Sequence, residues 1–242
     1  MTTTLDGILN KRVMLEQPAH GFRVAVDTVL LAAAVPAQAG DRILELGCGV
    51  GGAMLALACR VPQVTITGLE IQAALAQLCA ANIARNAFVA TLDVREADAM
   101  RLPPALRDQF DHVMMNPPYH DDARHDASPD ASRRMANSES AGALDRWLAS
   151  AAQALKPQGL LTLIHRADRL DEISRLLTGN FGAIQIKPII PRAATPPKRL
   201  LIRAIKGGKH EPTTLAPLAL HNATGYTPEA DAILRDGAAV AF

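Results

Sequence analysis

The stretch ELGCGVGG at residues 45–52 constrains the fold of this chain more than any other part of the sequence. It begins at the end of the apolar run RILEL and leads into the helix-favouring run AMLALACR. Three of its glycines have the spacing G-x-G-x-x-G, which lets the backbone turn tightly and approach a ligand without a Cβ in the way. This pattern predicts a buried strand, a ligand-binding turn and a helix in direct succession.

Strands and helices alternate along the rest of the chain. The expected strands cover residues 42–46, 64–70, 88–94, 110–116, 159–165, 183–190 and 199–205. Helices are expected over 71–85 and 144–155, from helix-favouring composition in the first case and apolar spacing in the second. The alternation indicates an α/β protein with Rossmann-like topology, in which helices cover both faces of a doubly wound, mostly parallel sheet of seven strands.

The 242 residues are expected to form a single domain. Residues 1–35 are expected to contain a hairpin and a helix that starts near Asp27, and to extend over the ligand site. Residues 36–206 form the expected core and residues 207–242 a C-terminal extension. Residues 119–138 have no apolar periodicity, which predicts a long loop; loops of this length are usually either disordered or active-site lids.

The composition argues against a disulfide-stabilised protein, a membrane-spanning protein and a protein with strong overall attraction to nucleic acid. Hydrophobic residues make up 49% of the chain and the net charge is +1, which allows a large core and gives no strong overall attraction to nucleic acid. The three cysteines are odd in number and scattered, as expected for reduced thiols. No apolar run reaches the ~18 residues of a membrane span. We therefore expect a cytoplasmic protein without a membrane segment, whose oligomeric state the sequence leaves open.

Two carboxylates flank the glycines. Glu70 ends the second expected strand, where a carboxylate can accept hydrogen bonds from ribose hydroxyls. Glu45 precedes Gly47, Gly49 and Gly51 in the pattern E-x-G-x-G-x-G. A carboxylate there suits a ligand with a cationic end and is unfavourable beside a pyrophosphate, which a dinucleotide places at a helix N-terminus.

This pattern resembles the S-adenosylmethionine loop of the Rossmann-like, class I methyltransferases. That cofactor carries a cationic sulfonium and an amino group and has no phosphate, which agrees with the position of Glu45. The resemblance also implies that Asp98, which follows the third expected strand, lies near the adenine of the cofactor.

The fourth expected strand ends in NPPY at residues 116–119. Proline cannot donate to a β-ladder, so the strand must stop at Asn116, at the sheet edge where open α/β sheets bind ligands. The Asn116 side chain and the Pro117 carbonyl can accept both N–H bonds of a planar amino group and favour its pyramidal form in the transition state. Tyr119 can stack on a base or an amide. The stretch resembles the (N/D)-P-P-(Y/F) motif of methyltransferases that act on amino nitrogens.

Together with QPAHGFRVAVDTVLLAA at 17–33, these motifs resemble a family of bacterial tRNA adenine-N6 methyltransferases, which modify the adenine beside the anticodon of a valine tRNA. The resemblance runs over most of the chain. It implies S-adenosylmethionine as the cofactor, with Phe22, Arg23 and Asp27 around its methionine end. It also implies that the NPPY residues hold the target adenine.

A run of basic residues supports an RNA substrate. From residue 187 to residue 209 there are seven basic residues and no acidic one: Lys187, Arg192, Lys198, Arg199, Arg203, Lys206 and Lys209. Such a stripe suits contacts with phosphates. Arg124, Arg133 and Arg134 in the 119–138 loop are expected to add to it, against four aspartates in the same loop.

Other functions stay open on the residues alone. A protein glutamine (N5) or an rRNA guanine (N2) would use the same chemistry, although the glutamine enzymes usually carry a helical domain before the glycine loop. An NAD-dependent oxidoreductase would leave Glu45 and NPPY without a role, and an idle RNA-binding relative would not need the NPPY corner. The acidic and histidine residues between His120 and Asp126 match no standard metal site, so no metal is expected.

Overall fold

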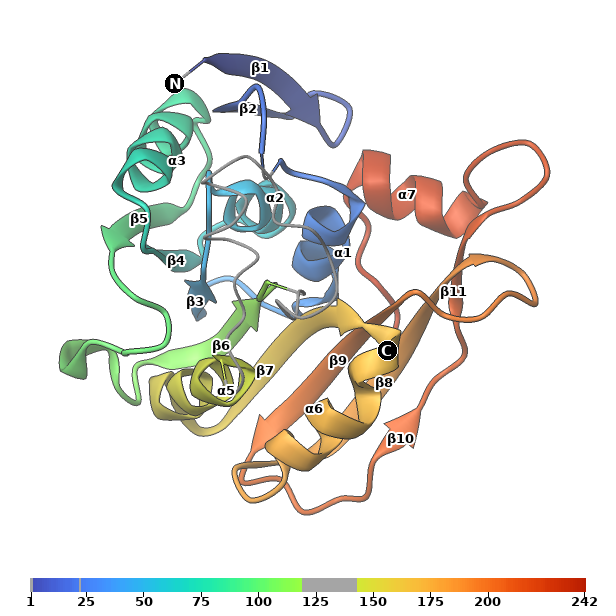
Figure 1. The fold of residues 1–242 in the computed structure, drawn as a ribbon. Helices are drawn as coiled ribbons and strands as arrows, with labels where there is room; N and C mark the ends of the chain where they lie inside the picture. The colour runs from blue at the N-terminus through green and yellow to red at the C-terminus, as the bar shows by residue number, and fades with distance from the viewer. Residues whose placement is uncertain (1, 22, 119–142) are drawn as a thin grey trace.

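One large sheet with helices on both faces makes up most of the molecule (Figure 1). The N-terminal residues of the chain form a separate two-stranded hairpin. The computed structural model describes residues 2–21, 23–118 and 143–242. The strands are β1 (Thr3–Ile8), β2 (Val13–Pro18), β3 (Arg42–Leu46), β4 (Thr65–Glu70), β5 (Thr91–Glu96), β6 (Phe110–Met115), β7 (Leu155–Arg166), β8 (Phe181–Arg192), β9 (Arg199–Lys206), β10 (Thr213–Thr214) and β11 (Leu218–His221). The helices are α1 (Val26–Ala34), α2 (Gly52–Arg60), α3 (Ala73–Arg85), α5 (Ala143–Ala154), α6 (Leu170–Leu177) and α7 (Pro228–Asp236), with 3-10 turns η1 (Pro104–Leu106) and η2 (Ala167–Arg169).

The large sheet has the strand order β10-β8-β9-β7-β6-β3-β4-β5, and β11 also pairs with β8. Every described pair in it is parallel except those that β9 makes with β7 and β8. The predicted α/β fold with about seven mostly parallel strands and an N-terminal hairpin is therefore confirmed. The short strands β10 and β11 come from the C-terminal part of the chain and add to the edge at β8.

Some boundaries differ from those expected. The third strand begins at Thr91 and not at residue 88, because its pairing with β4 starts where Thr91 stands opposite Thr65. Helix α5 ends at Ala154, and β7 follows at once at Leu155, four residues before the strand expected from residue 159. These shifts leave the order of the elements unchanged.

The two faces of the sheet bury separate apolar clusters. Ile43 of β3 belongs to a cluster that contains Leu30 of α1 and Leu55 of α2. The next residue, Leu44, belongs to a second cluster, which contains Leu148 of α5. Successive side chains of a strand point to opposite faces, so an apolar strand such as β3 can hold helices on both sides.

The helix α1 begins one residue before the expected Asp27 and has Ala25 at its N-cap, with no side-chain cap. The hydroxyl of Thr28 instead accepts a hydrogen bond from the Ala25 backbone N–H at 3.5 Å. None of the helices within the described ranges is both long and apolar enough to span a bilayer.

Candidate active site

Three of the predicted site residues come together at the carboxyl edge of the sheet. Leu46, the last residue of β3, pairs in register with Leu69 of β4 on one side and with Met115 of β6 on the other. Gly47, Glu70 and Asn116 are the next residues of these three strands, so they stand at one edge.

The glycine loop takes a backbone conformation that other residues rarely adopt. Gly47, Gly49 and Gly51 have φ angles of +67°, +56° and +87°, and Gly51 is the N-cap of α2. The loop is also tightly enclosed. A Cβ on Gly47 would lie 2.4 Å from Cη2 of Trp147, which packs against the loop from α5.

Glu70 lies directly beside this loop and is buried. One carboxylate oxygen accepts a hydrogen bond from the Gly49 N–H at 2.9 Å and the other accepts from the Gln72 N–H at 2.8 Å. Burial raises the pKa of Glu70, and these backbone hydrogen bonds oppose part of the rise. The carboxylate is thus held in place at the strand end where ribose hydroxyls were expected to bind.

Glu45 is 4% exposed and has a structural partner. Its Oε2 accepts a hydrogen bond at 2.9 Å from the N–H of Met54, in the first turn of α2. Burial raises the pKa of Glu45 well above its usual range, and nearby Cys79 and Glu70 act in the same direction. A contact of Glu45 with the positive end of a cofactor stays a prediction.

The NPPY corner begins where it was expected. Asn116 follows the last residue of β6 and is half-buried, and Pro117 is buried. Because β6 pairs with β3, the corner starts next to the glycine loop. Tyr119 and the 119–138 loop lie outside the described residues, as does Phe22.

The structure places two other predicted cofactor residues in ion pairs. Arg23 faces the hairpin, where its guanidinium donates to the Asp6 carboxylate at 2.8 Å and to the Pro18 carbonyl at 2.8 Å. Asp27 accepts from Nε of Arg199 at 2.7 Å. Their contact with the methionine end of a cofactor stays a prediction.

Asp98 lies just beyond the end of β5. Its carboxylate accepts a hydrogen bond from the Met100 N–H at 2.8 Å, and the N–H of the preceding Ala97 donates to the Glu70 carbonyl at 3.0 Å. The residue before Asp98 therefore pairs with the strand that carries Glu70, and a contact of Asp98 with an adenine stays a prediction.

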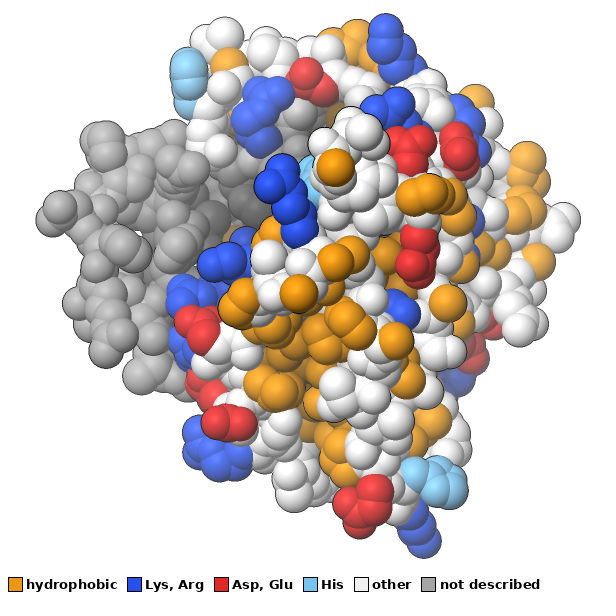
Figure 2. All heavy atoms as spheres, turned by 90° about the vertical axis from the view of Figure 1, so that its right-hand side faces the viewer, with side chains coloured by type: hydrophobic (Ala, Val, Ile, Leu, Met, Phe, Trp, Pro, Cys, Tyr) orange, Lys and Arg blue, Asp and Glu red, His pale blue; other side chains and the backbone are white. Residues whose placement is uncertain are grey.

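The seven basic residues of 187–209 do not form one stripe. Arg192, Lys198 and Arg199 lie at the edge that carries the site, because β8 is parallel to β7 and the turn into β9 closes at that edge. Since β9 runs the opposite way, Lys206 and Lys209 lie at the far edge. The face at the β8 and β11 side shows an apolar centre surrounded by Lys, Arg, Asp and Glu side chains of both signs (Figure 2).

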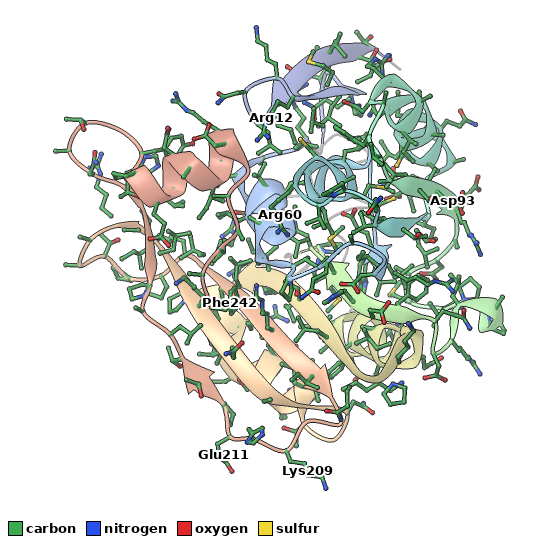
Figure 3. The ribbon with its side chains drawn as sticks, turned by 180° about the vertical axis from the view of Figure 1, so that it is seen from behind. Arg12, Arg60, Asp93, Lys209, Glu211 and Phe242 are labelled. Atoms are coloured by element: carbon green, nitrogen blue, oxygen red, sulfur yellow. The ribbon has the colours of Figure 1, made fainter. Side chains whose placement is uncertain are left out.

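Two members of the run are wholly or partly withdrawn from solvent. Lys187 is buried. Arg203 donates to the Ala34 carbonyl at 2.8 Å, and its guanidinium lies 3.7 Å from the ring centroid of Phe242. Burial, with a smaller effect of Arg60, lowers the pKa of Arg203 to about 10. Figure 3 shows Arg60 and Phe242 on the back of the molecule.

The fold and the site define a class I methyltransferase that uses S-adenosylmethionine. The chain belongs to the methyltransferase small domain family, whose model matches residues 22–188. It is 32% identical over 232 residues to the tRNA1(Val) (adenine(37)-N6)-methyltransferase of Porphyromonas gingivalis, covering 90% of this chain and 89% of that one. A protein of the same name from Yersinia enterocolitica is 27% identical over 233 residues, covering 95% and 91%.

Solved structures share the fold. A protein of Agrobacterium tumefaciens described as a predicted O-methyltransferase matches with a TM-score of 0.74 and 30% identity, covering 89% of this chain and 99% of that one. The tRNA (m1A58) methyltransferase TrmI of Aquifex aeolicus matches with a TM-score of 0.55 at 11% identity, covering 80% and 73%. The predicted family resemblance, enzyme class and cofactor are confirmed by these comparisons.

The described residues fit this cofactor better than a dinucleotide. The Met54 N–H in the first turn of α2 is taken by the Glu45 carboxylate, where a dinucleotide would need free amides for its pyrophosphate. The positive-φ glycines carry no side chain beside the Glu70 carboxylate, so a nucleoside can approach the backbone closely there.

Proposed function

We propose that this enzyme methylates the exocyclic N6 of an adenine in the anticodon loop of a tRNA. The observation that carries the proposal is the register of β3 and β6, which sets Asn116 and Pro117 beside the glycine loop. The names of the relatives, adenine(37)-N6-methyltransferases of tRNA1(Val), support the same acceptor. With such a substrate, the proposed location of the enzyme is the cytoplasm.

The chemistry of the acceptor explains the corner. The bound cofactor supplies an electrophilic methyl group, and an adenine amino group is a poor nucleophile because its lone pair is delocalised into the ring. In this proposal the Asn116 side chain and the Pro117 carbonyl accept its two N–H bonds and aim the nitrogen for in-line displacement. The ring of Tyr119 stacks on the base.

The cofactor is held, in this proposal, by residues that the sequence motifs and the family resemblance together assign to the site. They are Phe22, Arg23, Asp27, Glu45, Gly47, Gly49, Gly51, Glu70, Asp98 and Asn116. Among the described members, the Glu70 carboxylate is the one whose position beside the loop best fits a direct contact with ribose hydroxyls.

Phosphate contacts are proposed for the basic residues at the edge of the site. Arg192 and Lys198 are exposed there, and Arg199 lies beside them. Arginine and lysine side chains at such an edge hold a nucleic acid through its phosphates and leave the base to the catalytic corner.

The test is a methylation assay on a transcribed valine tRNA, followed by mass spectrometry of the nucleosides. We expect N6-methyladenosine from the transcript and none from a transcript with guanosine at position 37. Methylation of the control at the same level would overturn the assignment to that position. A methylated guanine in rRNA or a methylated glutamine in a protein, with unmodified tRNA, would establish one of the alternative acceptors.

A further inference from the structure

Asn82 of α3 and Asn86, the residue that caps the C-terminus of this helix, form the hydrogen bonds that a neighbouring strand would form at the edge of the N-terminal hairpin. Asn86 accepts from the Met14 N–H at 2.9 Å and donates to the Met14 carbonyl at 2.8 Å. Asn82 does the same with Glu16, at 2.7 Å and 2.9 Å. Four residues of helix rise about 6 Å and two residues of strand about 6.6 Å, so the two side chains match alternate residues of β2.

Asn82 has a further partner that Asn86 lacks. Its Nδ2 also donates to the carbonyl of Val50, in the glycine loop, at 3.0 Å. Asn86 uses its second N–H within its own helix, on the Asn82 carbonyl at 2.7 Å. Asn82 is fully buried, and its amide binds the hairpin and the cofactor loop at the same time.

The hairpin also holds Val24, which contacts Gly52 at the end of the loop. The buried side chain of Gln17 accepts from the Val24 N–H at 2.9 Å and donates to Asp6 at 3.0 Å. The side chain of Val24 lies against the loop, because a Cβ on Gly52 would come within 2.6 Å of it.

We propose that the hairpin is a scaffold of the cofactor site and that Asn82 is the positioning residue that joins the two. The Val50 carbonyl lies between the glycines, and a buried carbonyl that loses its donor either stays unsatisfied or turns away. Without Asn82 the loop loses the conformation that admits the cofactor. This inference depends on the cofactor loop and is independent of which acceptor the enzyme methylates.

The matched variants are Asn82→Ala and Asn86→Ala. Each removes two hydrogen bonds to the hairpin. Asn82→Ala also removes the bond to Val50 and the side-chain acceptor of Arg85, whereas Asn86→Ala also removes the bond to the Asn82 carbonyl. We expect both to speed amide exchange in β2 and lower the melting temperature. Asn82→Ala should weaken calorimetric binding of S-adenosylhomocysteine about tenfold, and Asn86→Ala by less than about twofold. Equal loss in both variants, or no loss in either, would overturn the proposal.

A measurement on the unaltered protein covers the case in which Asn82→Ala does not fold. Saturation with S-adenosylhomocysteine should slow exchange of the Met14 and Glu16 amides, which contact α3, several-fold. Unchanged exchange at both positions with the ligand bound would refute the link between hairpin and loop. Because both experiments follow cofactor binding, a failure of the tRNA assay would leave their outcome intact.

Discussion

The carboxylate of Asp27 and the guanidinium of Arg199 form an ion pair, with 2.7 Å between Oδ2 and Nε. The pair joins the first turn of α1 to the first residue of β9 at the edge that carries the site. Arg199 is thereby fixed in direction, whereas Arg192 and Lys198 in the same turn region are exposed. The exposed pair is therefore the better candidate for contacts with phosphates.

Charge reversal at Arg192 and Lys198 together should weaken tRNA binding at least tenfold at low salt. The slope of log affinity against log salt should become shallower by about 1 for each phosphate that the variant no longer neutralises. The control is Lys209→Glu, because Lys209 is equally exposed but lies beyond the far end of β9 (Figure 3). Filter binding over a salt series measures both. If Lys209→Glu had the larger effect, RNA would approach from the other edge.

Replacement of Asn116 by alanine should slow methyl transfer and leave cofactor binding close to normal. The loss of one preorganised acceptor in the transition state corresponds to about 2–4 kcal/mol, by analogy with an oxyanion-hole donor. Single-turnover rates with saturating tRNA, together with calorimetry of S-adenosylhomocysteine, separate the two effects. A variant with normal rates and weak cofactor binding would place Asn116 in the cofactor pocket alone.

Gly47→Ala should destabilise the fold strongly. At a φ of +67° an added Cβ is strained, and it would lie 2.4 Å from the Trp147 ring. Strain of about 1–2 kcal/mol and overpacking of a similar or larger size should lower the free energy of unfolding by about 2–4 kcal/mol. Gly40→Ala is the control, since Gly40 has a φ of +92° but nothing within 4 Å of its Cβ position. The two variants should lose different amounts of unfolding free energy in urea denaturation, and the difference measures the clash with Trp147. Equal losses in the two variants would contradict the clash.

Local patterns predicted the parts of the site that local chemistry determines. The glycines end one strand because they adopt positive φ angles, and the prolines end another because they have no N–H to donate. The glycine loop and Asn116 could therefore be placed from the sequence. Glu16 and Val50, which Asn82 joins, lie 66 and 32 residues away from it, and Arg199 lies 172 residues away from Asp27. Such contacts depend on how the elements pack, which no local pattern encodes. The spacing of Asn82 and Asn86 on one helix face was the one visible sign of their role.

The interior position of part of the basic run was equally hidden. Arg203 lies in β9, which has a neighbouring strand on each side. The sequence alone does not indicate that its guanidinium binds the Ala34 carbonyl and stacks on the ring of Phe242. A run of like charges predicts a surface only when its strand is exposed on that face. In a sheet covered on both faces, such a residue must find internal partners.

Glu70→Ala should weaken cofactor binding more than it slows the chemical step. The carboxylate is held by the amides of Gly49 and Gln72, so its loss removes both a contact with the proposed ribose and a support of the loop. Charged hydrogen bonds of this kind correspond to about a 10- to 100-fold change in affinity. Glu96→Ala is the control, because Glu96 pairs in register with Glu70 and is exposed. A variant whose rate falls while its affinity for S-adenosylhomocysteine stays normal would contradict the role.

Glu45→Gln should make the fold more stable at neutral pH and the cofactor complex weaker. Burial raises the pKa of Glu45 above its usual 4.5, so the folded protein binds the proton over a range in which the unfolded chain has lost it. The stability that this carboxyl contributes is present below pH 4.5 and is lost as the pH rises through the folded pKa. Glutamine can still accept from the Met54 N–H and carries no charge.

The advantage of the Glu45→Gln variant in urea midpoint should therefore grow as the pH rises above 4.5 and level off once the pH exceeds the folded pKa, and a difference that stays constant as the pH rises from 4.5 would contradict the shift. Its affinity for S-adenosylmethionine should fall at the same time if Glu45 faces the cationic end of the cofactor, because only the carboxylate attracts that charge. S-Adenosylhomocysteine, which lacks the sulfonium charge, should lose less affinity than S-adenosylmethionine. Equal losses for the two ligands would assign Glu45 to the support of α2 alone.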